Sequence, residues 1–296
     1  MITSAVSPAL VLAALIAIQV LFGAGYVVSK IVVTAFPPLV WASIRIIVSS
    51  FIMLAYALAS GRKHPDDGAK FFKPLIVFAL LGMVINQTSF LLGLSYTTST
   101  NSAILNTLIP VFTLLIVTIR GQEPATPKRI IGFCMSFIGV LVIRHVENFS
   151  LSDKTLIGDL LTMLNCFSYA LFLSYSKKFI EQHDRIWTTT WLFIYGSVGI
   201  TLVALPSYVG FHWPVMTGTL WACVSFAIVG TTLLTYFLNN FTLAHTKSSH
   251  VALFIYLQPI IAAAIAWIWF GEVITLRTAL SSGLIFLGVV LAMSKR

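Results

Sequence analysis

The chain has 296 residues, of which 58% are hydrophobic and 9% are charged, with a mean hydropathy of +0.96 and a formal net charge of +9. About a quarter of the residues of a soluble domain are charged, so the composition excludes a water-soluble protein and predicts a chain embedded in a membrane. The three cysteines lie singly in apolar runs, which predicts neither a disulfide framework nor a metal site.

Apolar runs close to the ~20 residues that a membrane-spanning helix needs recur along the whole chain. In chain order we predict ten spans, at residues 8–33, 38–60, 72–93, 98–119, 129–146, 155–177, 187–206, 216–238, 248–270 and 276–293. No basic segment precedes the first run, so we interpret it as an uncleaved helix rather than a removable signal. The predicted fold class is an all-α polytopic membrane protein in one membrane domain.

The basic residues indicate the orientation. With a cytoplasmic N-terminus, the inner loops and tail contain thirteen of the eighteen Lys and Arg: Arg62, Lys63, Lys70, Lys73, Arg120, Lys128, Arg129, Lys177, Lys178, Arg185, Lys247, Lys295 and Arg296. Four more lie outside or near the outer ends, namely Lys30, Arg144, Lys154 and Arg277. This excess predicts that both termini are cytoplasmic. Topology therefore accounts for the net charge, and we expect no nucleic-acid partner.

The chain contains an internal repeat. Residues 94–142 align without a gap with residues 243–291, at a separation of 149 positions. Further upstream, "FGAGYVVSK" at 22–30 falls on "YALFLSYSK" at 169–177, at a separation of 147. The unit is half of the chain and contains five predicted spans.

Five is an odd number, so the second copy enters the membrane upside down. We therefore predict ten transmembrane helices in two inverted five-helix repeats, over residues 1–147 and 148–296. Inverted repeats build a site near the middle of the membrane, between the halves, that can open to either side.

Several of these features resemble the drug/metabolite transporter superfamily, and more narrowly its EamA-type ten-helix branch. They are the two five-span halves, the "GDLL…YALFLSYSKK" opening of the second half, and a proline followed thirteen residues later by a glutamate in spans four and nine. The arginine of "PLVWASIR" and the closing "GLIFLGVVLA" fit as well. Family members often have tryptophan where this chain has Phe22 and Tyr169. The resemblance implies a bacterial inner-membrane exporter of metabolites, with (aromatic) amino acids a recurring substrate class.

Two prolines interrupt spans at equivalent points of the repeat. Pro110 and Pro259 each remove a backbone hydrogen bond within a helix and clash with the preceding turn. We predict that they are hinges, used in opposite senses by the two halves. The alternative is a pair of static kinks.

Polar side chains are concentrated in spans three, four, six, eight and nine. Amides buried in hydrocarbon cost several kcal/mol unless they are paired, so these side chains should face the protein interior. They could line a substrate cavity or join helices to one another. The candidate substrate-binding residues are Asn86, Gln87, Asn101, Asn106, Asn165, Ser168, Tyr169, Thr235, Tyr256 and Gln258.

Charged residues within or beside the spans are few. Arg45 could attract a substrate carboxylate, whereas the family resemblance implies a structural role. Glu123 and Glu272, equivalent in the repeat, are expected to fasten the ends of the hinge helices, with Lys128 and Arg277 as neighbouring partners. Asp159 is a candidate proton site, or alternatively a cap of its helix.

The leading hypothesis is an alternating-access exporter of small zwitterionic metabolites, most of all amino acids with apolar or aromatic side chains. Alternatives on the same fold are a transporter of anionic metabolites, such as nucleotide sugars or sugar phosphates, and a drug exporter. HExxH and GxSxG are absent from the sequence, so we expect no enzyme, no cofactor and no metal. The expected partners are a small-molecule substrate and the lipid bilayer. We expect a monomer, with dimer packing through the small face from Gly132 to Gly139 as the alternative.

Overall fold

The computed structural model describes residues 7–65, 68–96, 102–103, 105–124, 126–143, 153–261, 264–265 and 276–293, and this part of the chain contains helices and turns but no strand. The α-helices are α1 (Pro8–Ala35), α2 (Pro38–Ala59), α3 (Ala69–Ala79), α4 (Asn86–Tyr96), α6 (Leu108–Ile119), α7 (Pro127–Ile143), α8 (Asp153–Gln182), α9 (Arg185–Ala204), α10 (Gly218–Ile228), α11 (Thr235–His245), α12 (Ser248–Leu253) and α14 (Leu276–Met293). Four further helical turns extend them: the π-helical η1 (Leu80–Ile85) and η4 (Val229–Leu234), and the 3₁₀-helical η3 (Leu205–Tyr208) and η5 (Phe254–Leu257).

Local chemistry explains where several of these helices begin. α1 and α2 start on Pro8 and Pro38. Proline is pre-organised for the first helical position, where its missing N–H has no partner to lose. α9 follows Asp184, whose carboxylate accepts the backbone N–H groups of Ile186 at 2.9 Å and Trp187 at 3.1 Å. Such a cap satisfies donors that the first helical turn leaves open.

Six helices in the described part are long and apolar enough to cross a membrane: Pro8–Ala35, Pro38–Ala59, Ala69–Tyr96, Leu156–Gln182, Arg185–Tyr208 and Gly218–His245. They confirm six of the predicted spans. In the regions of the other four spans the structure describes shorter helices, namely α6, α7, α12 with η5, and α14. The total of ten transmembrane helices therefore stays a prediction.

The helix boundaries follow the two separations of the sequence repeat. α1 and α8 end 147 residues apart, at Ala35 and Gln182, and α2 and α9 begin 147 residues apart. The long helices Ala69–Tyr96 and Gly218–His245 match at both ends with a separation of 149. Each contains a six-residue π-helical turn, η1 or η4, again 149 residues apart. A π turn is rare, so its recurrence at one position of both halves is a strong structural equivalence.

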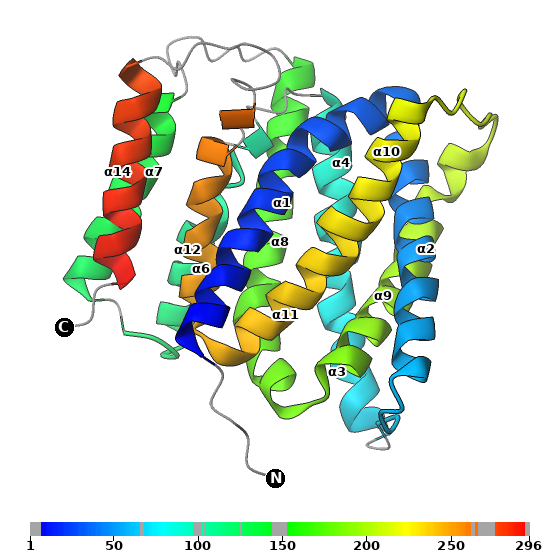
Figure 1. Ribbon diagram of the computed structural model, residues 1–296, viewed down its shortest axis with the longest axis horizontal. Helices are drawn as coiled ribbons and strands as arrows, with labels where there is room; N and C mark the ends of the chain where they lie inside the picture. The colour runs from blue at the N-terminus through cyan, green and yellow to red at the C-terminus, as the bar shows by residue number, and fades with distance from the viewer. Residues whose placement is uncertain are drawn as a thin grey trace.

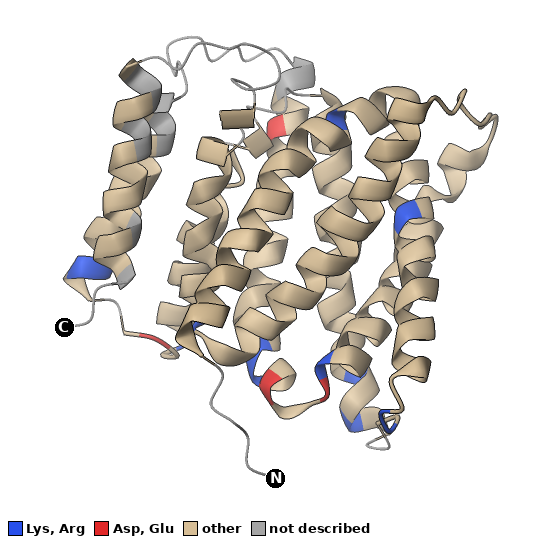
Figure 2. Cartoon of the chain, viewed as in Figure 1, with Lys and Arg blue, Asp and Glu red and all other residues tan. Residues whose placement is uncertain are grey.

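Equivalent helices run in opposite directions. In Figure 1, α1 rises from the lower edge and α8 descends from the upper edge, while α2 descends and α9 rises. α1 begins and α14 ends at the same lower edge. The charged residues lie mostly at the two ends of the helices and leave the middle almost uncharged (Figure 2).

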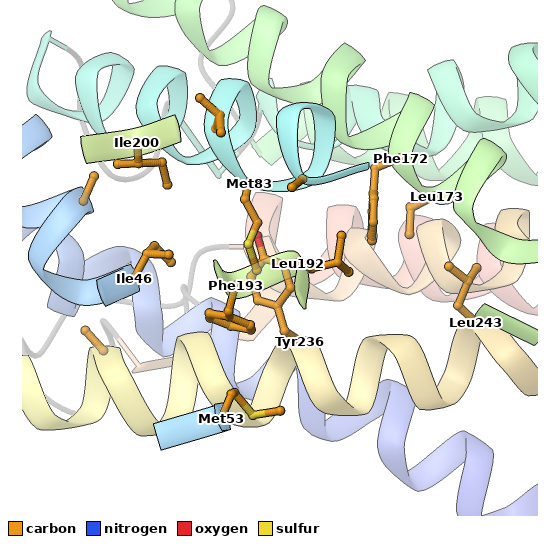
Figure 3. Packing of buried hydrophobic residues seen from close by; sticks show 14 of the residues in the cluster. Ile46, Met53, Met83, Phe172, Leu173, Leu192, Phe193, Ile200, Tyr236 and Leu243 are labelled. Atoms are coloured by element: carbon orange, nitrogen blue, oxygen red, sulfur yellow. The ribbon is translucent and has the colours of Figure 1, made fainter. Parts of the chain in front are cut away.

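The halves interlock through matching contacts. α1 of the first half packs on α10 and α11 of the second, and α8 of the second half packs on η1 and α4 of the first. Between them lies the apolar core of Figure 3, where Met83, Phe193 and Tyr236 converge. The rings of Phe193 and Tyr236 lie 5.3 Å apart. A Cβ at Gly196 would come within 2.6 Å of the Met83 sulfur, so a larger residue there would displace the Met83 side chain.

α7 and α14 form an outlying pair at one edge of the bundle (Figure 1). A Cβ added to Gly132 on α7 would lie 2.5 Å from the carbonyl oxygen of Gly288 on α14. The small-residue face of this helix therefore packs within the chain at Gly132, because only a residue without a side chain permits so close an approach.

Candidate functional site

A central cavity lies between the two halves, where α1, α2, α4, α6, α8, α11, α12 and η5 meet. The volume of the cavity that water can reach is about 80 Å³, which is room for several water molecules. Its walls are Ile18, Gln19, Phe22, Gly25, Tyr26, Ser29, Arg45, Asn86, Gln87, Phe90, Asn106, Ile109, Asn165, Tyr169, Thr231, Tyr236, Asn239, Val251, Ile255 and Gln258.

Twelve of these twenty residues stand at positions that are equivalent in the repeat. At the separations of 147 and 149 residues, the pairs are Ile18/Asn165, Phe22/Tyr169, Gln87/Tyr236, Phe90/Asn239, Asn106/Ile255 and Ile109/Gln258. In five of the six pairs one member is apolar and the other has a polar group. Equivalent positions of the two halves thus line one cavity, and they differ in polarity, so the cavity has both polar and apolar wall residues.

One hydrogen-bonded network on the wall starts at Arg45 of α2. Its Nη2 donates to Oε1 of Gln87 on α4. The Gln87 amide nitrogen donates in turn to Oδ1 of Asn86 at 2.8 Å and to the hydroxyl of Tyr236 at 2.9 Å. That hydroxyl donates to the carbonyl oxygen of Gly82 in the π turn η1, at 2.7 Å. The network therefore joins α2 and α4 to α11.

A chain of amides continues from the same place. Asn86 Nδ2 donates to Oδ1 of Asn165 on α8, and Asn165 Nδ2 donates to Oδ1 of Asn106 at 2.6 Å. Asn106 Nδ2 donates to the carbonyl oxygen of Ser102 at 2.8 Å. Each amide donates to the next, so the buried groups compensate one another.

The second half takes part in three further polar contacts. Gln258 accepts a hydrogen bond from the Tyr26 hydroxyl at 2.9 Å and donates to Oε1 of Gln19 at 2.7 Å. Asn239 donates to the Tyr169 hydroxyl. Both Gln258 contacts join the first half to the second, as do the bonds Gln87–Tyr236, Asn86–Asn165 and Asn165–Asn106. The polar wall is therefore also the seam between the halves.

Of the ten candidate substrate-binding residues, the structure brings six to the cavity wall: Asn86, Gln87, Asn106, Asn165, Tyr169 and Gln258. Ser168 and Thr235 are buried away from it and donate to the backbone carbonyls of Leu81 and Thr231, at 2.6 and 2.7 Å. Asn101 lies outside the described residues.

Tyr256 also lies away from the cavity. Its ring is fully buried in a small apolar cluster between α7, α12 and α14, against Phe133. Its hydroxyl has no hydrogen-bond partner among the described residues. The phenol is therefore part of the packing that holds the outlying helix pair.

The cavity also contains polar residues outside the predicted set, namely Gln19, Tyr26, Ser29, Arg45, Thr231, Tyr236 and Asn239. The repeat offered a signal for one of them, because Tyr236 is equivalent to the predicted Gln87. Asn239 is equivalent to Phe90, which also lines the cavity but was not among the predicted residues. Gln19 lies in a strongly apolar helix, and no pattern in the sequence distinguishes it.

The two predicted hinge prolines stand where helices are already broken. Pro110 is the third residue of α6, directly after the turn at Asn106 and Thr107. Pro259 follows the 3₁₀ turn η5. The residues one and four positions before each proline line the cavity: Ile109 and Asn106 before Pro110, and Gln258 and Ile255 before Pro259. A change of angle at either proline therefore moves two cavity residues.

Glu123 forms a buried ion pair with Arg129, in the connection from α6 to α7. Gly121 makes the preceding turn possible, because its φ of +64° suits glycine. Arg129 also donates to the Ser249 hydroxyl of α12, and Ser249 donates to Glu123. The partner of Glu123 is thus Arg129 and not the predicted Lys128, whose side chain is exposed. We call Glu123, Arg129 and Ser249 the end clasp, because they fasten the first half to the second.

The charge state of the end clasp is well defined. Burial alone would raise the pKa of Glu123, but hydrogen bonds from Ser249 and Arg129 and the charge of Arg129 outweigh burial and hold the pKa below its usual value. The carboxylate is therefore ionised at neutral pH. Glu272, its counterpart in the repeat, lies outside the described residues.

Asp159 is the seventh residue of α8 and is buried, and it does not line the cavity. It stands too far along the helix to cap the first turn. Its role as a proton site stays a prediction.

Comparisons with known proteins agree with this architecture. The EamA-like transporter family matches the chain twice, over residues 9–144 and 156–294. An uncharacterized transporter of Archaeoglobus fulgidus is 28% identical over 286 residues, covering 95% of this chain and 97% of the relative. The uncharacterized inner membrane transporter YedA of Escherichia coli is 24% identical over 94% of this chain and 89% of its own.

A solved crystal structure superimposes on the fold with a TM-score of 0.75, covering 95% of this chain and 96% of the other at 14% sequence identity. The two family matches coincide with the two halves of the repeat and together cover nearly the whole sequence. The chain is a multi-pass membrane protein that belongs to the EamA-like transporter family.

Proposed function

We propose that the protein is an alternating-access exporter of small zwitterionic metabolites, with amino acids of apolar or aromatic side chain as its leading substrates. The observation that supports this best is the division of the central cavity. Amides and phenols of one half line the cavity at the positions where the other half has Ile18, Phe22, Phe90, Ile109 or Ile255. Neutral polar groups can replace the water around an ammonium and a carboxylate, while the apolar wall accepts a hydrophobic side chain.

The transport mechanism that we propose rests on the inverted repeat. Helices of equivalent sequence run in opposite directions (Figure 1), as two five-helix halves related by a two-fold axis in the membrane plane would do. Rocking at Pro110 in one half and at Pro259 in the other would open the cavity to alternate sides. In this proposal the ten helices lie in a bacterial inner membrane with both termini in the cytoplasm.

The charge of the cavity separates the alternatives. Arg45 is the one cationic side chain among the described residues that line it, and no Asp or Glu is among them. A nucleotide sugar or sugar phosphate carries more negative charge than a single buried arginine can pair. A cationic drug would favour a carboxylate on the wall. A zwitterion, with one carboxylate and one ammonium, suits this composition better than either.

The test is flux through purified protein in liposomes, with labelled phenylalanine, threonine and a nucleotide sugar, with and without a pH gradient. We expect phenylalanine flux, and we expect Pro110→Ala and Pro259→Ala each to slow it roughly tenfold while binding is retained, because the hinge limits the conformational step. Exposed Lys178→Gln is the matched control and should transport normally. Flux of the nucleotide sugar without amino-acid flux would overturn the substrate assignment, and unchanged flux in both proline variants would overturn the hinges.

A further inference from the structure

Arg45 is a buried cation whose described partners are all neutral. Its side chain lies two turns into α2 and the residue is only 3% exposed. The guanidinium donates to Gln87, and its Nε is buried with no hydrogen-bond partner among the described residues. No ion pair joins it to a described carboxylate. A guanidinium has five N–H donors, so most of its capacity is not used by the polar wall.

Such an arrangement is costly unless an anion completes it. An arginine in the middle of a membrane costs about 2.5–3.5 kcal/mol even on the mildest scales, and a buried charge needs pairing as well as hydrogen bonds. If the role of Arg45 were to join helices, a neutral residue could hold Gln87 without that cost. The cation is among the residues that line the central cavity.

The network behind Arg45 fixes its direction. Gln87 accepts from the guanidinium while its own amide nitrogen donates to Asn86 and Tyr236. Tyr236 is anchored to the backbone of Gly82. Because both donors of the Gln87 amide are engaged, its oxygen is turned toward Arg45. Gln87 therefore acts as a positioning residue for the guanidinium.

We propose that Arg45 binds the carboxylate of the transported molecule and is the residue that makes the cavity selective for carboxylates. A guanidinium can bind a carboxylate through two parallel hydrogen bonds, which fixes orientation as well as affinity. The repeat supports a single anchor, because the position equivalent to Arg45 in α9 is the buried Leu192. One carboxylate then sets one orientation, with the apolar part of the molecule toward Phe22 and Phe90. This inference rests on the proposed transport function.

The experiment compares carboxylates with the matching carboxamides, in which the carboxyl group no longer carries a charge: phenylalanine with phenylalaninamide, threonine with threoninamide, and 3-phenylpropionate with 3-phenylpropionamide. Affinity is measured from ligand-dependent thermal stabilisation of the purified protein, and KM from flux in liposomes. We expect wild type to bind each carboxylate at least about tenfold tighter than its amide. Arg45→Met should weaken carboxylate binding roughly tenfold to hundredfold, the value of a charged hydrogen bond, and change amide binding less than about threefold.

Two further variants separate the anchor from a structural role. Arg45→Lys keeps the charge and should restore part of the carboxylate preference. Should Arg45→Met fail to fold, the double variant Arg45→Met with Gln87→Leu replaces the pair with apolar side chains of similar size, which is often neutral for stability. Lys178→Gln, at an exposed position, removes a cation as a control.

The outcomes distinguish this inference from the proposed substrate class. Wild type without a preference in any pair, or equal losses for acid and amide in Arg45→Met, overturns the anchor. A preference for 3-phenylpropionate without binding of either amino acid supports the anchor and overturns the zwitterion proposal. Preference for the amino acids that disappears in Arg45→Met supports both.

Discussion

The two halves of the protein make equivalent contacts between a long helix and a π turn, but in one contact the glycine lies on the helix and in the other it lies on the π turn. In one, Gly25 of α1 lies against Thr231 of η4, where an added Cβ would come within 2.8 Å of the threonine methyl group. In the other, Phe172 of α8 lies against Gly82 of η1, where an added Cβ would come within 2.6 Å of the ring. Gly25 and Phe172 are equivalent in the repeat, and so are Thr231 and Gly82. Phe172 of the long helix α8 fills the space at one contact, and Thr231 of the π turn η4 fills it at the other.

The difference teaches that backbone geometry has been kept where side chains have diverged. The π turns, the helix ends and the broken helices at the prolines recur in both halves, whereas the cavity pairs differ in polarity. A cavity with true two-fold symmetry would present the same groups twice. Divergence of the side chains gives the cavity a direction.

The largest expected effect comes from breaking the end clasp. The counterpart of its Arg129 in the repeat is the uncharged Thr278. Glu123→Gln leaves Arg129 buried without its anion, and we expect a loss of about 3–5 kcal/mol in the free energy of unfolding. Chemical denaturation of the protein in detergent micelles measures this loss.

The matched control for the end clasp is Lys128→Gln, an exposed neighbour that should cost less than about 0.5 kcal/mol. The effect has a defined pH window. Because the pKa of Glu123 is lowered in the folded protein, its contribution is present above the ordinary glutamate pKa of about 4.3 and is lost as pH falls through the lowered value. A Glu123→Gln variant as stable as Lys128→Gln at pH 7 would show that the ion pair stabilises nothing.

An intermediate effect is expected from exchanging the sizes at the contact between η1 and α8. Gly82→Thr introduces the residue that the second half has at this position, and its side chain meets Phe172. Overpacking of this kind costs about 1–3 kcal/mol. Adding Phe172→Ala, which alone should also destabilise, makes room for the threonine, so the double variant should lose less than the sum of the two single losses. Thermal unfolding in a double-mutant cycle gives this coupling, and additive losses would contradict the equivalence of the two contacts.

The helices and the repeat could be predicted because both depend on patterns that are visible in the sequence itself. Apolar length determines a membrane-spanning helix, and the fixed separation of Pro110 and Pro259 indicated equivalent positions. Six of the ten predicted substrate residues reach the cavity, and five of them are amides. Amides must avoid lipid, and the seam between the halves is one of the few places where they can do so.

The features that the sequence could not predict depend on the direction in which a side chain points from its helix. Ser168 and Thr235 donate to backbone carbonyls and do not line the cavity. The acceptor of Thr235 is one turn back in its own helix, as is common for hydroxyls, whereas that of Ser168 is Leu81 in η1 of the other half. Arg45 faces the cavity only because the register of α2 against α4 turns it to Gln87. The partner of Glu123 differs from the predicted one by a single residue, since the turn after α6 brings Arg129 inward and leaves Lys128 outside.

The smallest expected effect concerns two lysines that cap equivalent helices at opposite ends of the molecule. Lys30 donates to the carbonyl oxygen of Leu94 at 2.8 Å, near the end of α4, and Lys177 donates to that of Leu243 at 3.0 Å, near the end of α11. A cation at a helix C-terminus stabilises it by about 0.3–1 kcal/mol. Lys30→Met should therefore speed hydrogen exchange in the last turn of α4 and not in that of α11, and Lys177→Met in the last turn of α11 and not in that of α4.

The comparison is sharpest when both variants are measured on the same protein, with exposed Lys178→Met as the control. Lys177 also donates to the carbonyl of Thr246, beyond the end of α11, so its removal should loosen the connection to α12 as well. Loss of protection at both helix ends in either variant would mean that the ammonium groups act through the whole bundle. Protection lost at one end alone would show that each half holds its own helix, which is what independent movement of the two ends requires.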